Sequence, residues 1–277
     1  MNRDKIIIIL AFVVSIFFLS TGTELFAKEG VSPAQLDRMG IISPADYGNI
    51  VLDSKTGEGK AMPAVVFPHW WHRTQFTCKV CHQELGFPMK AGETDFVMGD
   101  IFAGKQCGAC HNGSIAFMPM DCARCHSQGQ DVPQNRKIEE ELKDLPKDDF
   151  GNKVDWVKAI RDGSIKPKAT LDGTGEMMVV DMDIDIPVAK FKPSPPDVVY
   201  PHKAHTEWLD CSNCHTSIFN MQKGGNPDMN MMKIISGQYC GVCHGKVAFP
   251  LENCFRCHSA DPKPIEDLFQ LEEKARV

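Results

Sequence analysis

The sequence predicts a mostly irregular fold of short α-helices with little β-structure, organised as two small modules in tandem. Two observations carry this prediction: all twelve cysteines fall into six C-x-x-C-H motifs, and the second half of the chain repeats the first. An apolar fraction of 43% and a charged fraction of 24% are typical of globular proteins, which excludes disorder of the whole chain. The net charge of −6, with no basic block, argues against a nucleic-acid partner.

The first 27 residues have the layout of a secretory signal peptide. Arg3 and Lys5 precede an apolar run from Ile6 to Leu19, and small and polar residues follow before a cut after Ala27. Leu25 stands where a small residue is usual, so a retained anchor is the alternative. A run of 14 residues is nevertheless shorter than a membrane span, which needs about 20. In both cases the cysteines are exported, and we expect the periplasm or else the outer surface. Membrane contact is expected only if the segment is retained.

Each of the six cysteine pairs is followed at once by a histidine. The pairs are Cys78/Cys81, Cys107/Cys110, Cys122/Cys125, Cys211/Cys214, Cys240/Cys243 and Cys254/Cys257, and the histidines are His82, His111, His126, His215, His244 and His258. By chance this composition would yield the motif roughly 0.02 times. Exported cysteines often form disulfides, and C-x-x-C pairs also build zinc sites, but neither requires a histidine at this fixed place.

The motif is the attachment site of c-type haem. Two thiols three residues apart add to the two vinyl groups of one porphyrin, and the next side chain then lies under the iron as the proximal ligand. The sequence therefore predicts six covalently attached haem c groups. Residues 65–126 carry three motifs, about 21 residues per haem, which is too little chain to bury each haem in its own apolar pocket. We expect the haems to pack on one another, which gives electrons a short route between irons.

An internal repeat supports two triheme modules. A shift of 133 residues places Val65–His72 on Val198–His205 and aligns the first two motifs of each half. Asn112 is an extra residue in the first copy, after which a shift of 132 aligns the third motifs. Between the motifs, Asp95–Gly104 pairs with Asp228–Gly237, and each stretch predicts a short helix with Asp at its N-cap and Gly just past its end.

The pattern divides the chain into six segments. After the signal come a wrapping segment (28–64), the first module (65–127), a linker (128–197), the second module (198–259) and a tail (260–277). The linker predicts a helix near Lys153–Arg161 that ends at Asp162-Gly163, a strand pair in the alternating run Val179–Val188 and an extended stretch at Pro193–Pro196. We expect residues 264–275 of the tail to form an amphipathic helix that packs on the protein.

Both modules resemble the triheme cytochrome c7 type of the class III c-type cytochromes, which is related to cytochrome c3. The likeness rests on three C-x-x-C-H motifs per module after an aromatic-Pro-His-x-x-His start, here Phe67–His72 and Tyr200–His205. It implies a small, loop-rich fold around stacked haems, two axial ligands per iron, and electron carriage in the periplasm or at the outer surface. One departure concerns the histidine that often stands four residues before the second motif, where this chain has Ala103 and Ser236.

Four histidines remain for six sixth-ligand positions: His69, His72, His202 and His205. An ordinary core or surface histidine is the alternative, but none of the ten stands outside the repeat. Two histidines spaced i, i+3 lie on one helical turn, and one iron has room for only one of them, so each pair must serve two haems. The resemblance implies that His69 and His202 serve the first haem of each module, while His72 and His205 serve the second.

The third haem of each module needs another partner. Met98 and Met231 occupy matching repeat positions shortly before Ala103 and Ser236, and we expect them to be the sixth ligands. Core-packing methionines, or an open iron, are the alternatives.

Two function classes follow. The first is an electron carrier with fully ligated irons that exchanges electrons with other redox proteins, such as cytochromes and quinol-linked or extracellular components. The second is a multihaem reductase with an open iron. The sequence favours the carrier, because it has no C-x-x-C-K variant and no spare histidine for acid–base chemistry. Self-association into a haem filament is a third reading that composition leaves open.

Overall fold

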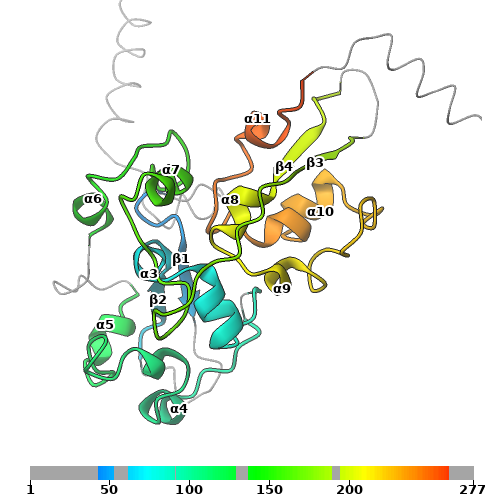
Figure 1. The fold of residues 1–277 in the computed structure, drawn as a ribbon. Coiled ribbons are helices and arrows are strands. Elements are labelled where there is room, and N and C mark those ends of the chain that lie inside the picture. Colours follow the sequence, from blue (N-terminus) through cyan, green and yellow to red (C-terminus); the bar gives the residue numbers. More distant parts are fainter. Residues whose placement is uncertain (1–42, 53–61, 91, 129–136, 189–193, 262–277) are drawn as a thin grey trace, which may run out of the picture. The chain divides into compact units, whose positions relative to one another are not determined.

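Short helices and two small antiparallel sheets make up the described part of the chain (Figure 1). The computed structural model describes residues 43–52, 62–90, 92–128, 137–188 and 194–261. The chain divides into two compact units, Met1–Ser43 and Pro44–Val277, and the second contains both modules and the linker. The predicted fold class, mostly irregular with short helices and little β-structure, is confirmed.

The elements follow the repeat. Around the first module they are β1 (Asn49–Leu52), β2 (Val65–Pro68), α3 (His69–Gln75), η2 (Val80–Glu84), α4 (Met98–Phe102), η3 (Gln106–Ala109) and α5 (Cys122–Cys125). The linker contains α6 (Ile138–Glu141), α7 (Trp156–Arg161) and β3 (Asp183–Ile186). The second module contains β4 (Val198–Pro201), α8 (His202–Thr206), α9 (Cys211–Cys214), α10 (Met231–Ile235), η4 (Tyr239–Val242) and α11 (Cys254–Cys257).

A two-stranded sheet precedes the paired histidines in each module. β1 pairs with β2 in the register Asn49↔Pro68, and β3 pairs with β4 in the equivalent register Asp183↔Pro201. The expected strand pair within Val179–Val188 is therefore corrected: that run supplies one strand, whose partner is β4. Its alternating exposed and half-buried residues fit a strand with only one face covered.

The helices between the first and second motifs end as predicted but begin later. α4 and α10 are each followed by a glycine with positive φ, Gly104 at +83° and Gly237 at +86°. The predicted N-caps at Asp95 and Asp228 are wrong. Asn230 caps α10 by accepting a hydrogen bond from the Lys233 amide, and α4 begins without a side-chain cap.

The linker supplies much of the conventional apolar core. Ile138, Leu142 and Val154 pack with Trp70 of the first module, while Ala159 and Ile165 pack with Trp208 of the second. With so few residues per haem, the modules themselves bury little apolar surface without their cofactors. The linker is thus a folded segment that packs on both modules.

The linker helix α7 matches its prediction closely. It starts three residues later than expected because the side chain of Asp155 accepts a hydrogen bond from the Lys158 amide and caps its N-terminus. It ends at Arg161, and Gly163 has a φ of +79°, as the Asp-Gly stop predicts.

Three predictions lie outside the described residues: the signal or anchor at 1–27, the tail helix at 264–275, and the start of the extended stretch at Pro193. In the parts of the chain that are described, no helix is long and apolar enough to cross a membrane.

Candidate haem sites

Each C-x-x-C segment folds as a single short helical turn. In five motifs the amide of the histidine donates to the carbonyl of the first cysteine, at 2.8–3.0 Å. The sixth, at Cys78–His82, runs into the π-helical turn η2. A helical turn places residues i, i+3 and i+4 on one face, so both thiols and the following imidazole can meet one porphyrin. All twelve cysteines, which lie in the described segments, are free thiols in this structure.

The Nδ1 atoms of the six motif histidines all lie within hydrogen-bond distance of a backbone carbonyl. The pairs are His82–Phe87, His111–Phe117, His126–Pro63, His215–Phe219, His244–Phe249 and His258–Pro196, at 2.8–3.2 Å. A carbonyl only accepts, so this contact places the ring proton on Nδ1 and leaves Nε2 free as a metal ligand. The geometry therefore fits the proximal role predicted for all six.

Three of the remaining histidines face a motif histidine at the spacing of two axial ligands. The ring centroids lie 6.5 Å apart for His69/His82, 6.3 Å for His72/His111 and 6.2 Å for His205/His244. A metal–imidazole nitrogen bond is about 2 Å long, so rings on opposite sides of one metal have centres about 6 Å apart. The structure therefore brings together three of the four pairs that the resemblance implied.

The fourth pair differs. Among the described residues, no ring contact joins His202 to His215, and the Nδ1 of His202 lies 3.2 Å from the carbonyl of Met182. His69, its counterpart in the first module, has a buried Nδ1 without a hydrogen-bond partner. The sixth ligand of the haem at Cys211/Cys214 stays a prediction without this geometric support.

Burial keeps several of these rings neutral. It lowers the pKa of His69 to about 3 and the pKa values of His72 and His244 to about 4. A neutral imidazole is the form that binds a metal.

The third motif of each module closes onto the module's own beginning. His126 contacts the carbonyl of Pro63 and forms a β-bridge with Val65, while His258 contacts the carbonyl of Pro196. The predicted modules do not include these two prolines, because the repeated pattern on which the modules rest begins at Val65 and Val198. The signal was present, since Pro63 and Pro196 also match under the shift of 133.

The structure places the predicted methionine ligands beside the middle motif. Met98 and Met231 are the first residues of α4 and α10, and they are 41% and 46% exposed. α4 approaches η3 so closely that a Cβ on Gly108 would lie 1.9 Å from the carbonyl oxygen of Ile101. No described contact joins either methionine to the third motif, so ligation by Met98 and Met231 stays a prediction.

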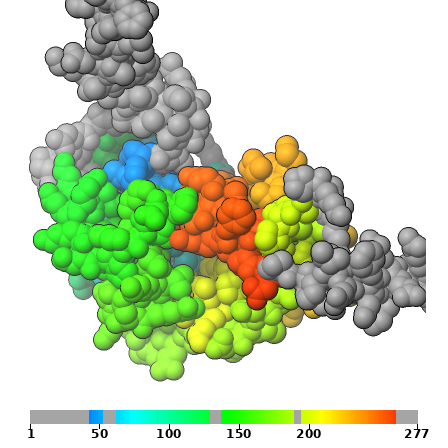
Figure 2. Space-filling view, turned by 90° about the horizontal axis from the view of Figure 1, so that it is seen from above, coloured from blue at the N-terminus to red at the C-terminus, as the bar shows by residue number. Residues whose placement is uncertain are grey.

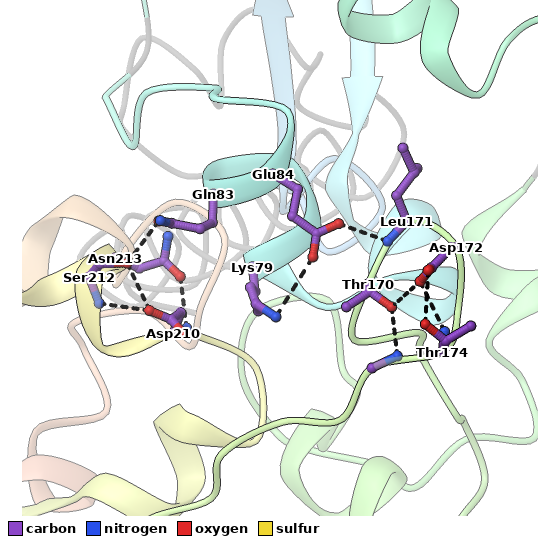
Figure 3. Close-up of polar contacts among 11 residues, drawn as sticks. Lys79, Gln83, Glu84, Thr170, Leu171, Asp172, Thr174, Asp210, Ser212 and Asn213 are labelled. Atoms are coloured by element: carbon purple, nitrogen blue, oxygen red, sulfur yellow. Dashed lines mark hydrogen bonds and ion pairs between the residues drawn. The ribbon is translucent and has the colours of Figure 1, made fainter.

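The first motifs of the two modules meet at a junction. η2 packs on α9, and the Lys79 amide donates to the carbonyl of Trp208 at 3.2 Å. The Ser212 hydroxyl donates to the side-chain oxygen of Gln83 at 2.8 Å (Figure 3). A capping box between Asp210 and Asn213 fixes the start of α9. On its other side η2 is tied to the linker, because the carboxylate of Glu84 accepts from the Leu171 amide (Figure 3).

A half-buried arginine reinforces this junction. The guanidinium of Arg73, on α3, lies 4.7 Å from the ring centre of Trp156 and 5.2 Å from that of Trp208. It also donates to the carbonyl of Val247 in the second module at 3.1 Å. The repeat places Thr206 at the equivalent position, so the second module has no arginine there.

The cysteines of different motifs lie close enough to influence one another. Burial raises the pKa of Cys81 to about 12 and that of Cys107 to about 11, and thiols of the neighbouring motif add to each rise: Cys110 and Cys107 act on Cys81, and Cys125 acts on Cys107. Burial likewise raises the pKa of Cys240 to about 11, with Cys257 of the third motif adding to it. The ring contacts agree: His69 and His72 of α3 face the first and second motifs, and Phe117 contacts both His111 of the second motif and Arg124 of the third, so the first module has the order first, second, third. In the second module Phe249 likewise contacts His244 and Arg256.

Cysteines also affect one another's pKa values across the junction between the two modules. Burial raises the pKa of Cys243 to about 12, and Cys78 of the first module and Cys214 add to that rise. Cys78 also adds to the rise of the Cys214 pKa. The first motif of the first module thus neighbours both the first and the second motif of the second module.

Comparison with known proteins points to one family. The pattern of cytochrome c7 and related cytochrome c matches residues 65–127 and 198–259. A solved c7-type three-heme cytochrome domain is 38% identical, with a TM-score of 0.25, and the similarity covers 28% of this chain and 91% of that one. No curated protein matches.

Two longer solved structures are also similar. The C-terminal hexaheme fragment of GSU1996 is 26% identical over 77% of this chain and 98% of the fragment, with a TM-score of 0.25. The dodecaheme cytochrome c GSU1996 is 23% identical over 85% of this chain and 62% of its own length, with a TM-score of 0.25. Because the family pattern covers residues 65–127 and 198–259, these two modules in tandem belong to the cytochrome c7 family.

Proposed function

We propose that the chain is a hexahaem electron carrier in which six haems form one path through both modules. Membership in the cytochrome c7 family implies covalently bound c-type haems and supports electron transfer. The observation that carries the proposal is the adjacency of the motifs. His69 and His72 of α3 face the first and second motifs of the first module, Phe117 and Phe249 each contact both a second and a third motif, and η2 packs on α9 across the junction.

The chain's own residues hold and orient the cofactors. Twelve cysteines would form the thioether bonds, and six motif histidines would bind the irons through Nε2 while their Nδ1 protons are held by carbonyls. His69, His72 and His205 would supply sixth ligands at the ring spacing described above, with His202 assigned by analogy. Each haem, when bound, supplies one-electron chemistry at its iron.

The order of motifs defines the route. From the third motif of the first module it runs through the second to the first motif, at Cys78. The junction contacts of Lys79, Gln83 and Ser212 then hold this motif against the second module. Electron transfer between the modules requires that their haems be held close together. The folded linker holds the two modules in fixed positions, because it packs on both of them.

The proposal includes an exported location. Multihaem c-type cytochromes are typically exported, which agrees with the signal-like segment at 1–27. We place the protein in the periplasm, with the outer surface as the alternative, and assign other redox proteins as its partners. Because this chain has a net charge of −6, we expect a redox partner to dock on it through a positively charged face.

The number of haems tests the proposal. The intact mass of the mature protein, made in a host that matures c-type cytochromes, is expected to show six haem additions. As a matched control, Cys254→Ala combined with Cys257→Ala should show five. Fewer than six additions in the native protein would overturn the hexahaem assignment.

A further inference from the structure

Both third motifs contain an arginine immediately before the second cysteine, and both arginines lie over a phenylalanine ring. The guanidinium of Arg124 is 3.7 Å from the centre of Phe117, and that of Arg256 is 4.8 Å from the centre of Phe249. Each module thus fixes one positive charge beside its third motif.

Each phenylalanine also contacts the proximal histidine of the second motif. The rings of Phe117 and His111 are 4.4 Å apart, and those of Phe249 and His244 are 4.3 Å apart. The same phenylalanines offer their carbonyls to the histidine Nδ1 atoms. The guanidinium charge therefore lies between the second and third haem sites, close enough to act electrostatically on both.

The two modules differ in how this charge is compensated. Arg256 forms an ion pair with Asp148 of the linker at 2.8 Å, and the side chain of Asp148 is only 7% exposed. The other carboxylate oxygen of Asp148 accepts from the Phe150 amide at 3.0 Å, which fixes the acid in place. In Figure 2 the orange surface of the α11 region lies directly against the green surface of the linker, in agreement with this contact.

In the first module the equivalent charge is on Arg124. Among the described residues, no carboxylate lies within ion-pair distance of Arg124, and its buried Nε has no hydrogen-bond partner. Within its described residues, the linker places an acid, Asp148, on Arg256 and none on Arg124. In the described part of the chain, the arginine at one end of the row of motifs is ion-paired and the equivalent arginine at the other end is not.

A haem gains one negative charge on reduction, so a nearby cation favours the reduced form and a nearby anion opposes it. Such effects are screened less for partly buried charges than for exposed ones. We propose that Asp148 is a potential-setting residue, which holds the third haem of the second module at a lower midpoint potential than the third haem of the first module. This inference rests on the proposed hexahaem function and adds a direction to it: at equilibrium, electrons collect at the first-module end.

The test is a redox titration of the holoprotein with haem-resolved NMR. Asp148→Asn is expected to raise the midpoint potential of the haem at Cys254/Cys257 and to leave that at Cys122/Cys125 unchanged. The matched control is Asp149→Asn, which removes the same charge from an exposed neighbour and should shift neither. Arg124→Gln should lower the midpoint potential of the haem at Cys122/Cys125. It should therefore also reduce the difference in potential between the two third haems.

A merely structural ion pair would give a different result. Asp148→Asn would then lower the midpoint of unfolding without moving either potential, and that outcome overturns the inference. If Asp148→Asn does not fold, Arg256→Gln reports the same charge from the other partner and should lower the potential at Cys254/Cys257. Six haems by mass with unmoved potentials would sink this inference alone, whereas a missing haem at Cys254/Cys257 would sink the proposed function with it.

Discussion

Gly108→Ala is expected to destabilise the holoprotein by about 3 kcal/mol, the upper end of the usual cost of overpacking. The added Cβ would lie 1.9 Å from the carbonyl oxygen of Ile101 and 2.8 Å from its carbonyl carbon. These are backbone atoms of α4, so no side-chain rotation relieves the clash, and α4 must move away from η3. Gly241 occupies the same position in the second module, where an added Cβ would lie 1.8 Å from the carbonyl oxygen of Ile234. Gly241→Ala should therefore destabilise the protein by a similar amount.

The matched control is Gly99→Ala. Gly99 lies within α4, and a Cβ on it would meet nothing within 4 Å, so alanine should be neutral or stabilise by up to about 1 kcal/mol. Guanidinium unfolding followed by circular dichroism and haem absorbance measures both variants. An unchanged unfolding midpoint for Gly108→Ala would show that α4 and η3 do not approach this closely.

His72→Met is expected to change the ligation of the haem at Cys107/Cys110 and to raise its midpoint potential, because a methionine ligand raises haem potentials relative to histidine. The ring of His72 lies 6.3 Å from that of His111, the motif histidine of this haem, and its Nδ1 is held by the carbonyl of Pro68.

The matched change is His69→Met, whose ring lies 6.5 Å from that of His82 with the two planes 1° apart. It should alter the haem at Cys78/Cys81 instead. Haem-resolved NMR separates the two cases, and a selective change at the first haem in His72→Met would reverse both assignments.

What the sequence could predict depended on local chemistry. The C-x-x-C-H motifs are contiguous, so the helical turns and the geometry of the motif histidines follow from a few adjacent residues. The stops of α4, α10 and α7 were predicted for the same reason, because a glycine with positive φ acts within one turn.

Contacts between distant residues escaped prediction. β1 and β3 pair with strands 12 or more residues away, and their sequences, NIVL and DIDI, share little that a repeat search can detect. Backbone pairing fixes these strands, and it does not require the same side chains in both copies. The cap of α10 was missed because Asn230, rather than the repeated Asp228, has the position from which a side chain reaches the Lys233 amide.

The contribution of the linker to the apolar core was not predicted, for a related reason. Its apolar residues are sparse along the sequence, and only the fold gathers them around Trp70 and Trp208. Asp148 is equally inconspicuous in an acidic stretch, and its importance follows from the contact with Arg256.

The measurement that tests the central claim most directly is a carbon monoxide difference spectrum of the reduced native holoprotein. A carrier whose irons all have two protein ligands is expected to bind no carbon monoxide, and this includes the third haems, for which Met98 and Met231 are the predicted ligands. His72→Ala serves as the positive control, because it should open one iron and bind the gas. Strong binding by the native protein would contradict the account, since it would reveal an open iron of the kind that a multihaem reductase uses.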